Sequence, residues 1–350
     1  MKMKNFYPPV LFLVMLFSGL LFSGSGLADF ALVLWFVSGL IIIVKGADCL
    51  VDGSSGFARH FRVSPLIIGL TIVSFGTSAP ELAVSVIASL TGSSGISIGN
   101  IVGSNIFNIG MILGLTAMIL PLSVGLSTVK IESPFMVLAS FLLFILSFSF
   151  LDSSPGPYVL GRIDGLVFLL LFSVFMYYTV TGAKRERKSA IRIPGDEKGN
   201  VRGFLTAMVL GIAGVIIGGE ILVYTATGMA KSLGISEAVI GLTVVAAGTS
   251  LPELATNIMA ALKKEGQIAI GNIIGSNIFN ILLVLGVAAA ISPMEVAASF
   301  VNFDMIVMIL FSVLLSFFIF TGRRLSRKEG FALFAGFLSY LGCLFYLTFA

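Results

Sequence analysis

Two glutamates stand inside long apolar stretches and are the residues best placed to do chemistry. Glu81 ends the segment GTSAPE, and Glu253 ends the segment GTSLPE. A charged side chain at the centre of a membrane-spanning helix costs about 2.5–3.5 kcal/mol on insertion scales. Two carboxylates that met there would repel each other, and a bound divalent cation would neutralise both. The alternative is a protonated glutamate that hydrogen-bonds between helices.

A proline precedes each glutamate and is expected to break the helix. Pro80 and Pro252 have no N–H, so the helix loses the hydrogen bond to the carbonyl four residues earlier, at Gly76 or Gly248. Such breaks are tolerated at membrane depth where the freed groups line a cavity. Unwound carbonyls of this kind can coordinate cations.

A second polar motif follows each glutamate. It reads GNIVGSNIFN up to Asn108 and GNIIGSNIFN up to Asn280. Ser104 and Asn108 are four residues apart and share a helix face, as do Ser276 and Asn280. The glycines of each motif form GxxxG, which is typical of close helix packing. For the serines and asparagines, hydrogen bonding between helices is the alternative to ion binding.

The candidate ligands are therefore carboxylate, hydroxyl, amide and carbonyl oxygens, without histidine or cysteine. Hard oxygen ligands suit Na⁺, Ca²⁺, Mg²⁺ or Mn²⁺ and argue against zinc or copper. Two glutamates with carbonyls and a water supply the six to eight oxygens that Ca²⁺ prefers.

The two sets of motifs belong to an internal repeat. Shifted by about 172 residues, the stretch 63–119 aligns without a gap with 235–291, and about half of its positions are identical. Each half has room for five helices. Because five is odd, the second half enters the membrane from the opposite side, which is the inverted-repeat architecture of many secondary transporters.

Composition sets the class of protein that holds these motifs. Of 350 residues, 57% are hydrophobic and 11% are charged, and the mean hydropathy is +1.08. These values exclude a soluble globular enzyme, a disordered chain and a nucleic-acid binder. Apolar runs long enough to span a membrane occupy residues 30–48, 65–90, 98–122, 133–151, 164–182, 203–227, 237–262, 267–291, 303–321 and 331–349. We expect an all-α integral membrane protein with ten transmembrane helices in two inverted-topology five-helix repeats.

Basic residues distinguish the two sides of the membrane. With the first of the ten helices starting outside, the outward loops carry only Arg162 and Lys231. The inward loops carry Arg59, Arg62, Lys130, Lys184, Arg185, Arg187, Lys188, Arg192, Lys198, Arg202, Lys263, Lys264, Arg323, Arg324, Arg327 and Lys328. Positive residues accumulate on the cytoplasmic side, so both mature termini are expected outside, in a multi-pass protein of the cell membrane.

Four regions follow along the chain. Residues 1–28 have the pattern of a signal peptide, with an extra uncleaved N-terminal helix as the alternative. The first five-helix repeat is expected over 29–182, and the second, inverted repeat over 203–350. Residues 183–202 contain Pro194, Gly195 and most of the loop charge, as expected of a cytoplasmic linker loop.

The paired motifs resemble the two alpha-repeats of the cation/calcium antiporter superfamily, and most closely those of the prokaryotic sodium/calcium exchangers. The resemblance covers both repeats and the frame from about Asp29 to the C-terminus. It implies a central Ca²⁺ site with the carboxylates of Glu81 and Glu253 and the carbonyls of Thr77 and Thr249.

The same resemblance implies Na⁺ sites around the central one. Its ligands and lining residues would be Ser78, Ser104, Ser250, Ser276, Asn108 and Asn280, with backbone from Ser74 and Ala246. In several relatives an aspartate stands where this chain has Asn280. The asparagine argues against potassium co-transport, which the potassium-dependent branch associates with that aspartate.

The sequence therefore predicts a secondary antiporter that exchanges Na⁺ for Ca²⁺ by alternating access, extrudes calcium and does not depend on potassium. The first and sixth helices are the candidates to move. Asp48 and Glu220, near the ends of their apolar runs, are expected to be interfacial or gating residues rather than ligands. A Ca²⁺/H⁺ antiporter of the same superfamily is the main alternative, and an open channel fits the repeats less well.

Several absences are also expected. The only histidine, His60, falls in a predicted loop and no HExxH is present, so an intramembrane protease is not supported. We expect no enzyme activity, no cofactor, no nucleic-acid partner and no obligate protein partner. Ca²⁺ and Na⁺ are the expected substrates, and the lipid bilayer is the expected surrounding.

Overall fold

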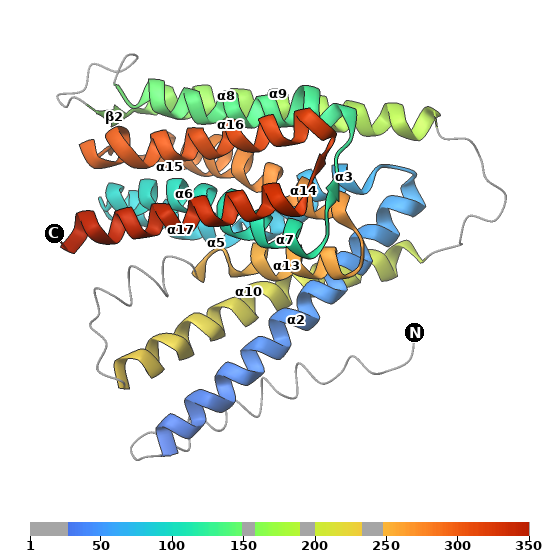
Figure 1. Cartoon of the computed structure of the whole chain (residues 1–350), viewed down its shortest axis with the longest axis horizontal. Coiled ribbons are helices and arrows are strands. Elements are labelled where there is room, and N and C mark those ends of the chain that lie inside the picture. The colour runs from blue at the N-terminus through green and yellow to red at the C-terminus, as the bar shows by residue number, and fades with distance from the viewer. Residues whose placement is uncertain (1–26, 149–157, 190–199, 233–247, 350) are drawn as a thin grey trace.

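The computed structural model describes residues 27–148, 158–189, 200–232 and 248–349, and this part is almost entirely helical (Figure 1). The first half contains α2 (Leu27–Phe61), α3 (Pro65–Ile68), η1 (Gly69–Val73), α4 (Ser74–Thr77), α5 (Ala79–Leu90), α6 (Ser94–Phe107), η2 (Asn108–Leu113), α7 (Gly114–Ile119), η3 (Thr128–Glu132), α8 (Ser133–Leu146) and α9 (Arg162–Ser189). The second half contains α10 (Val201–Ser232), α13 (Leu251–Leu262), α14 (Gly266–Ile278), η5 (Phe279–Leu285), α15 (Gly286–Ile291), η6 (Phe300–Asp304), α16 (Met305–Gly322) and α17 (Arg327–Phe349).

Nearly all of the expected membrane spans are present. In the described part of the chain, eight helices are long and apolar enough to cross a membrane, and a ninth is the pair 65–77 and 79–90, which is bent by 47° at its break. The remaining expected span, 237–262, lies partly outside the described residues and ends in α13. The expected signal-like segment lies outside them too, apart from its last two residues.

The long helices α2 and α10 differ from the expectation. They run to Phe61 and Ser232, beyond the ends predicted at residues 48 and 227. Asp48 and Glu220 therefore lie well inside their helices rather than near the ends, and His60 lies in the last turn of α2 rather than in a loop. Apolar runs end at the first charges, but a helix continues where those charges find water or a partner.

The pair α2 and α10 runs side by side, oblique to the other helices, along one side of the bundle (Figure 1). Glycines bring their backbones together. A Cβ on Gly46 would stand 2.6 Å from the nitrogen of Val215, and one on Gly218 would stand 2.6 Å from the nitrogen of Ile43. Because any side chain at these positions would collide with backbone, the two helices are joined by close backbone contact.

The helices that carry the second polar motif form the centre of the bundle. In the spans 94–119 and 266–291, 72% and 83% of the residues in the most apolar 18-residue stretch are buried. In the span 327–346 the corresponding share is 17%. The core is therefore built from α6–η2 and α14–η5, and α17 lies at the edge. This places the polar motifs away from lipid.

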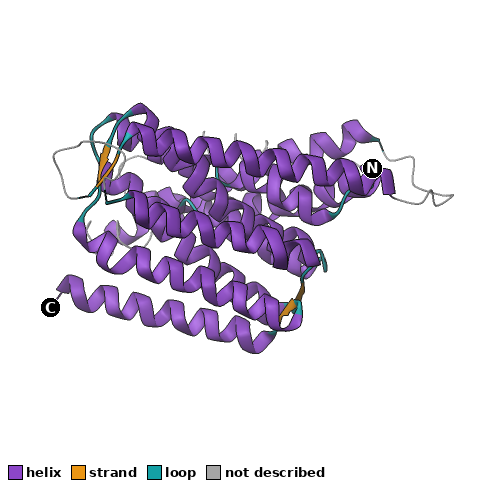
Figure 2. Cartoon of the chain, turned by 90° about the horizontal axis from the view of Figure 1, so that it is seen from above, coloured by secondary structure: helices purple, strands orange, loops and turns teal. Residues whose placement is uncertain are grey.

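Two features were not expected from the sequence. Turns of π-helix interrupt the spans at matching places in the two repeats, at Asn108–Leu113 and Phe279–Leu285 and again at Thr128–Glu132 and Phe300–Asp304. Two short antiparallel pairs also form, β1 (Leu122–Ser123) with β4 (Arg324–Leu325) and β2 (Val159–Leu160) with β3 (Met294–Glu295). Figure 2 shows these strands at opposite ends of the bundle, where they join the first half to the second.

Candidate ion-binding site

The two glutamates lie at matching helix breaks. Ser78 and Ser250 interrupt their helices with nearly the same backbone angles (φ −85°, ψ 8° and φ −90°, ψ 6°), and each break is followed by proline near the start of the next helix. Glu81 and Glu253 then fall in the first turn of α5 and α13, and both are fully buried. The break predicted from the prolines is therefore confirmed in both repeats.

Hydroxyl groups cross from each repeat to the carboxylate of the other. The Ser78 hydroxyl donates to Glu253 Oε1 at 3.2 Å, and the Ser250 hydroxyl donates to Glu81 Oε1 at 3.3 Å. Ser104 adds a second hydroxyl at 3.3 Å from the same Glu81 oxygen and stands 2.9 Å from the Ser250 hydroxyl. Glu81, Ser104, Ser250, Ser78 and Glu253 thus form one buried cluster at the interface of the repeats.

The threonines of the first motif are fixed by asparagines that open the second motif. The Thr77 hydroxyl donates to Asn272 Oδ1, and the Thr249 hydroxyl donates to Asn100 Oδ1, both at 3.2 Å. Asn100 also donates to the Glu81 carbonyl at 3.4 Å. Asn100 and Asn272 were not predicted as site residues, although the exact repetition of the GN dipeptide is the signal that could have identified them.

Asparagine side chains lie next to the cluster, at and just before the π-helical turns. Asn280 Nδ2 donates to Asn105 Oδ1 at 3.0 Å and to the Ser104 hydroxyl at 3.4 Å. Asn108 Nδ2 donates to Asn277 Oδ1 at 3.0 Å. Asn108 and Asn280 are fully buried, so the structure brings both predicted amides to the repeat interface.

Three other residues of the predicted site make no side-chain contact with the two glutamates within the described part of the chain or lie outside it. Ser276 is fully buried, but its hydroxyl has no hydrogen-bond partner among the described residues. The Ser74 hydroxyl donates to the carbonyls of Gly69 and Asn272 at 2.7 and 2.9 Å, and its own carbonyl accepts the Ser78 N–H at 2.9 Å. Ala246 lies outside the described residues.

Four buried oxygens in the cluster keep unused acceptor capacity. Within the described chain, Glu81 Oε2, Glu253 Oε2, Asn108 Oδ1 and Asn280 Oδ1 have no hydrogen-bond partner. Neither glutamate forms an ion pair there. Buried acceptors without donors are costly, and a hard cation satisfies carboxylate and amide oxygens together. The arrangement suits Ca²⁺ or Na⁺ held by oxygen ligands.

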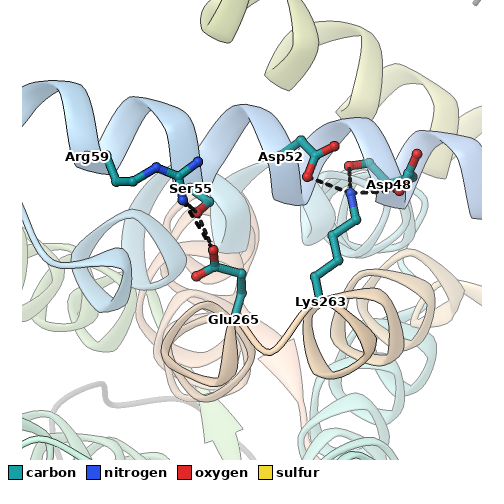
Figure 3. A network of polar contacts seen from close by, with 6 residues as sticks. All are labelled: Asp48, Asp52, Ser55, Arg59, Lys263 and Glu265. Atoms are coloured by element: carbon teal, nitrogen blue, oxygen red, sulfur yellow. Dashed lines mark hydrogen bonds and ion pairs between the residues drawn. The ribbon is translucent and has the colours of Figure 1, made fainter. Parts of the chain in front are cut away.

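A second polar cluster lies away from the glutamates and ties α2 to the turn between α13 and α14 (Figure 3). Lys263 Nζ lies 2.6 Å from Asp48 Oδ1, 2.6 Å from Asp52 Oδ1 and 2.9 Å from the Asp48 carbonyl. Arg59 and Ser55 contact Glu265, with the Arg59–Glu265 ion pair at 3.5 Å. We call these six residues the latch network.

Lys263 is the positively charged residue between Asp48 and Asp52 in the latch network. Burial lowers its pKa, but the hydrogen bonds and charges of Asp48 and Asp52 outweigh this effect and raise the pKa of Lys263 above its ordinary value. The ion pairs therefore persist through the neutral range. Asp48, predicted as a gating residue, lies in this network, whereas its counterpart Glu220 is exposed.

The fold defines a membrane protein of two inverted repeats, with a buried cluster of oxygen atoms at their interface. The family model of the sodium/calcium exchanger protein matches residues 31–181 and 204–346, so the chain belongs to the sodium/calcium exchanger family. It is 37% identical over 339 residues to the sodium/calcium exchanger MaX1 of Methanosarcina acetivorans, covering 88% of this chain and 97% of that protein.

Two further comparisons agree. The chain is 38% identical over 315 residues to the putative antiporter CaxA of Alkalimonas amylolytica, covering 88% of this chain and 96% of that protein. Its structure resembles the sodium-calcium exchanger NCX_Mj with a TM-score of 0.77 and 34% identity, over 89% of this chain and 98% of NCX_Mj. The ten-helix, inverted-repeat fold expected from the sequence is confirmed, and the family is one of transporters rather than enzymes.

Proposed function

We propose that this protein exchanges Na⁺ for Ca²⁺ across the cell membrane by alternating access, without potassium, and in the direction of calcium extrusion. The observation that carries the proposal is the buried pair Glu81 and Glu253, each hydrogen-bonded by a serine of the other repeat and neither paired with a basic side chain in the described part of the chain. MaX1 and NCX_Mj are named as sodium/calcium exchangers, which supports the same two ions.

The two carboxylates would bind Ca²⁺ with the carbonyls of Thr77 and Thr249. Their combined charge of −2 is neutralised by one Ca²⁺ or by Na⁺ ions, which use the same oxygens together with the hydroxyls and amides around them. The remaining proposed ligands are Ser78, Ser104, Ser250, Ser276, Asn108, Asn280, Ser74 and Ala246. The two ions are coupled because the protein would change its open side only when the site is loaded. The empty site carries an uncompensated negative charge and would not cross.

The proposal includes an arrangement in the membrane. Residues 29–182 and 203–350 would be the two inverted repeats, and residues 183–202 the cytoplasmic linker between them. Both mature termini would face outward. The latch network is consistent with this orientation, because it brings Lys263 and Arg59 to the same end of the bundle, where positive residues are expected on the cytoplasmic side.

The experiment is calcium uptake by the purified protein in liposomes. Vesicles loaded with Na⁺ and diluted into Na⁺-free buffer with labelled Ca²⁺ should accumulate calcium equally well with and without potassium. Vesicles with an outward proton gradient and no Na⁺ should not. Uptake driven only by protons would favour a Ca²⁺/H⁺ antiporter of the same fold, and uptake without any gradient that exceeds that of protein-free vesicles would favour a channel.

A further inference from the structure

Four asparagines are linked crosswise between the repeats, next to the glutamates. Asn280 of the second repeat donates to Asn105 of the first, and Asn108 of the first repeat donates to Asn277 of the second, both at 3.0 Å. All four are buried. Asn105 and Asn277 have no role in the proposed ion site, yet each accepts a hydrogen bond from an asparagine that does.

A backbone carbonyl sets the direction of one of these links. Asn105 Nδ2 donates to the carbonyl oxygen of Asn277 at 3.3 Å and lies 3.8 Å from the sulfur of Met308. A carbonyl oxygen can only accept, so the Asn105 side chain must place its nitrogen there and its oxygen on the opposite side. That oxygen can only accept in turn, and it faces the nitrogen of Asn280.

This chain of bonds determines which end of the Asn280 amide is left for an ion. With Nδ2 held by Asn105 and by the Ser104 hydroxyl, Oδ1 is the end without a partner among the described residues. A reversed Asn280 would set two acceptor oxygens against each other and present N–H groups to the site. Amide donors repel a cation, so a reversed Asn280 would be a weaker ligand.

We propose that Asn105 is a positioning residue that keeps the amide oxygen of Asn280 available to the transported cations, and that Asn277 does the same for Asn108. The second link is similar but has a weaker anchor, because Asn277 Nδ2 lies 3.8 Å from the sulfur of Met136 rather than against a backbone carbonyl, while Asn108 Oδ1 has no partner within the described chain. The inference rests on the proposed function in one respect, that Asn108 and Asn280 face the ions.

The test compares N105L in two backgrounds. Leucine has nearly the shape of asparagine but no acceptor, so the Asn280 amide becomes free to reverse. Calcium binding to the purified protein in detergent, measured by titration calorimetry, should weaken about tenfold, the loss expected when one polar contact is removed. The KM for Ca²⁺ in liposomes should rise by the same factor.

The second background is N280D. Both terminal atoms of an aspartate are oxygens, so either orientation of this side chain presents an oxygen to the cation. In N280D protein, a carboxylate oxygen faces the Asn105 oxygen in either orientation, and N105L removes that contact. Adding N105L should therefore not weaken the affinity for Ca²⁺ in this background, whereas it weakens the affinity of the protein that keeps Asn280. A merely structural role of Asn105 would weaken binding equally in both backgrounds and would overturn the proposal, as would wild-type affinity in N105L alone.

A parallel pair keeps the test decisive if N105L fails to insert. N277L removes the acceptor of the Asn108 amide and keeps the backbone carbonyl that anchors Asn105. Measured alone and with N108D, it should therefore weaken Ca²⁺ binding only where Asn108 is present. Equal weakening in both of these backgrounds would overturn the proposal. Calorimetry measures Ca²⁺ binding without Na⁺, so its result does not depend on transport. Failure of Na⁺-driven uptake by the wild-type protein would count against the proposed exchange. The binding results would still decide the role of Asn105 and Asn277.

Discussion

The two repeats match closely around Glu81 and Glu253 but differ where the long helices meet the turns of the motif hairpins. At the centre, Ser78 and Ser250 make equivalent bonds across the interface. At the edge, Lys263 and Glu265 of the α13–α14 turn bind α2, whereas the corresponding residues of the α5–α6 turn are Thr91 and Ser93, which cannot form ion pairs.

The difference extends to α10. The counterparts of Asp48 and Asp52 on α10 are the exposed Glu220 and Tyr224. Helix α2 packs along α13, but the packing of α10 on α5 is at most marginal in the described part of the chain. In the described part of the chain, the serine–glutamate contacts are therefore present in both repeats, whereas the ion pairs between a long helix and a motif turn are found at one end. We expect the conformation described here to be closed at the Lys263 end.

The largest expected effect concerns the matched centre. E81Q and E253Q each remove one carboxylate of the proposed site, and both should lower Na⁺-driven calcium uptake in liposomes by at least about 100-fold, because an amide supplies a single oxygen and no negative charge to balance Ca²⁺. E295Q is the matched control, since Glu295 is exposed on β3, and it should transport normally. Substantial uptake by either site variant would contradict a shared central site.

An intermediate effect is expected at the edge. K263M removes the ion pairs that hold α2 to the α13–α14 turn. Partly exposed pairs are worth on the order of 1 kcal/mol, so hydrogen exchange in residues 48–61 should speed up about threefold to tenfold. K264M, which removes the neighbouring lysine outside the latch network, should leave exchange unchanged. Identical protection in K263M and wild type would show that the latch network does not hold this end closed.

The smallest effect is a pH dependence. The raised pKa of Lys263 makes its contribution fully present below the unfolded-state value of about 10.4 and lost as pH rises through the folded-state value. Protection of residues 48–61, corrected for the intrinsic exchange rate, should therefore stay constant from about pH 6 to 9 and fall only above that range. K263M should lack the alkaline fall. A loss near neutral pH would point to another group.

Much of the centre could be predicted from the sequence, because the repeat displays most of the site residues twice in the same local pattern, with Ser74 and Ala246 as the exception. The helix breaks at Pro80 and Pro252 follow from the missing N–H alone. The pairing could not be predicted, since the sequence does not say that Ser78 bonds to Glu253 rather than to its neighbour Glu81. The asparagine links were missed for the same reason, because they join residues of different repeats.

The edge was predicted less well for a physical reason. The charges of Asp48, Asp52 and Arg59 resemble the end of an apolar run when α2 is read alone. They are compatible with a longer helix because Lys263 and Glu265, more than 200 residues away, supply partners. The contacts among the six residues of the latch network can be recognised only in the three-dimensional structure.

The glycine contacts between α2 and α10 have a consequence for ion leakage. Helices that touch through backbone at Gly46 and Gly218 have few flexible side chains between them to absorb a displacement. We therefore expect a shift of α2 away from Lys263 to carry α10 with it. In the proposed alternating-access cycle, one stiff body would then control the access from both sides, so we expect the two sides not to be open at once and ions not to leak down their gradients unpaired.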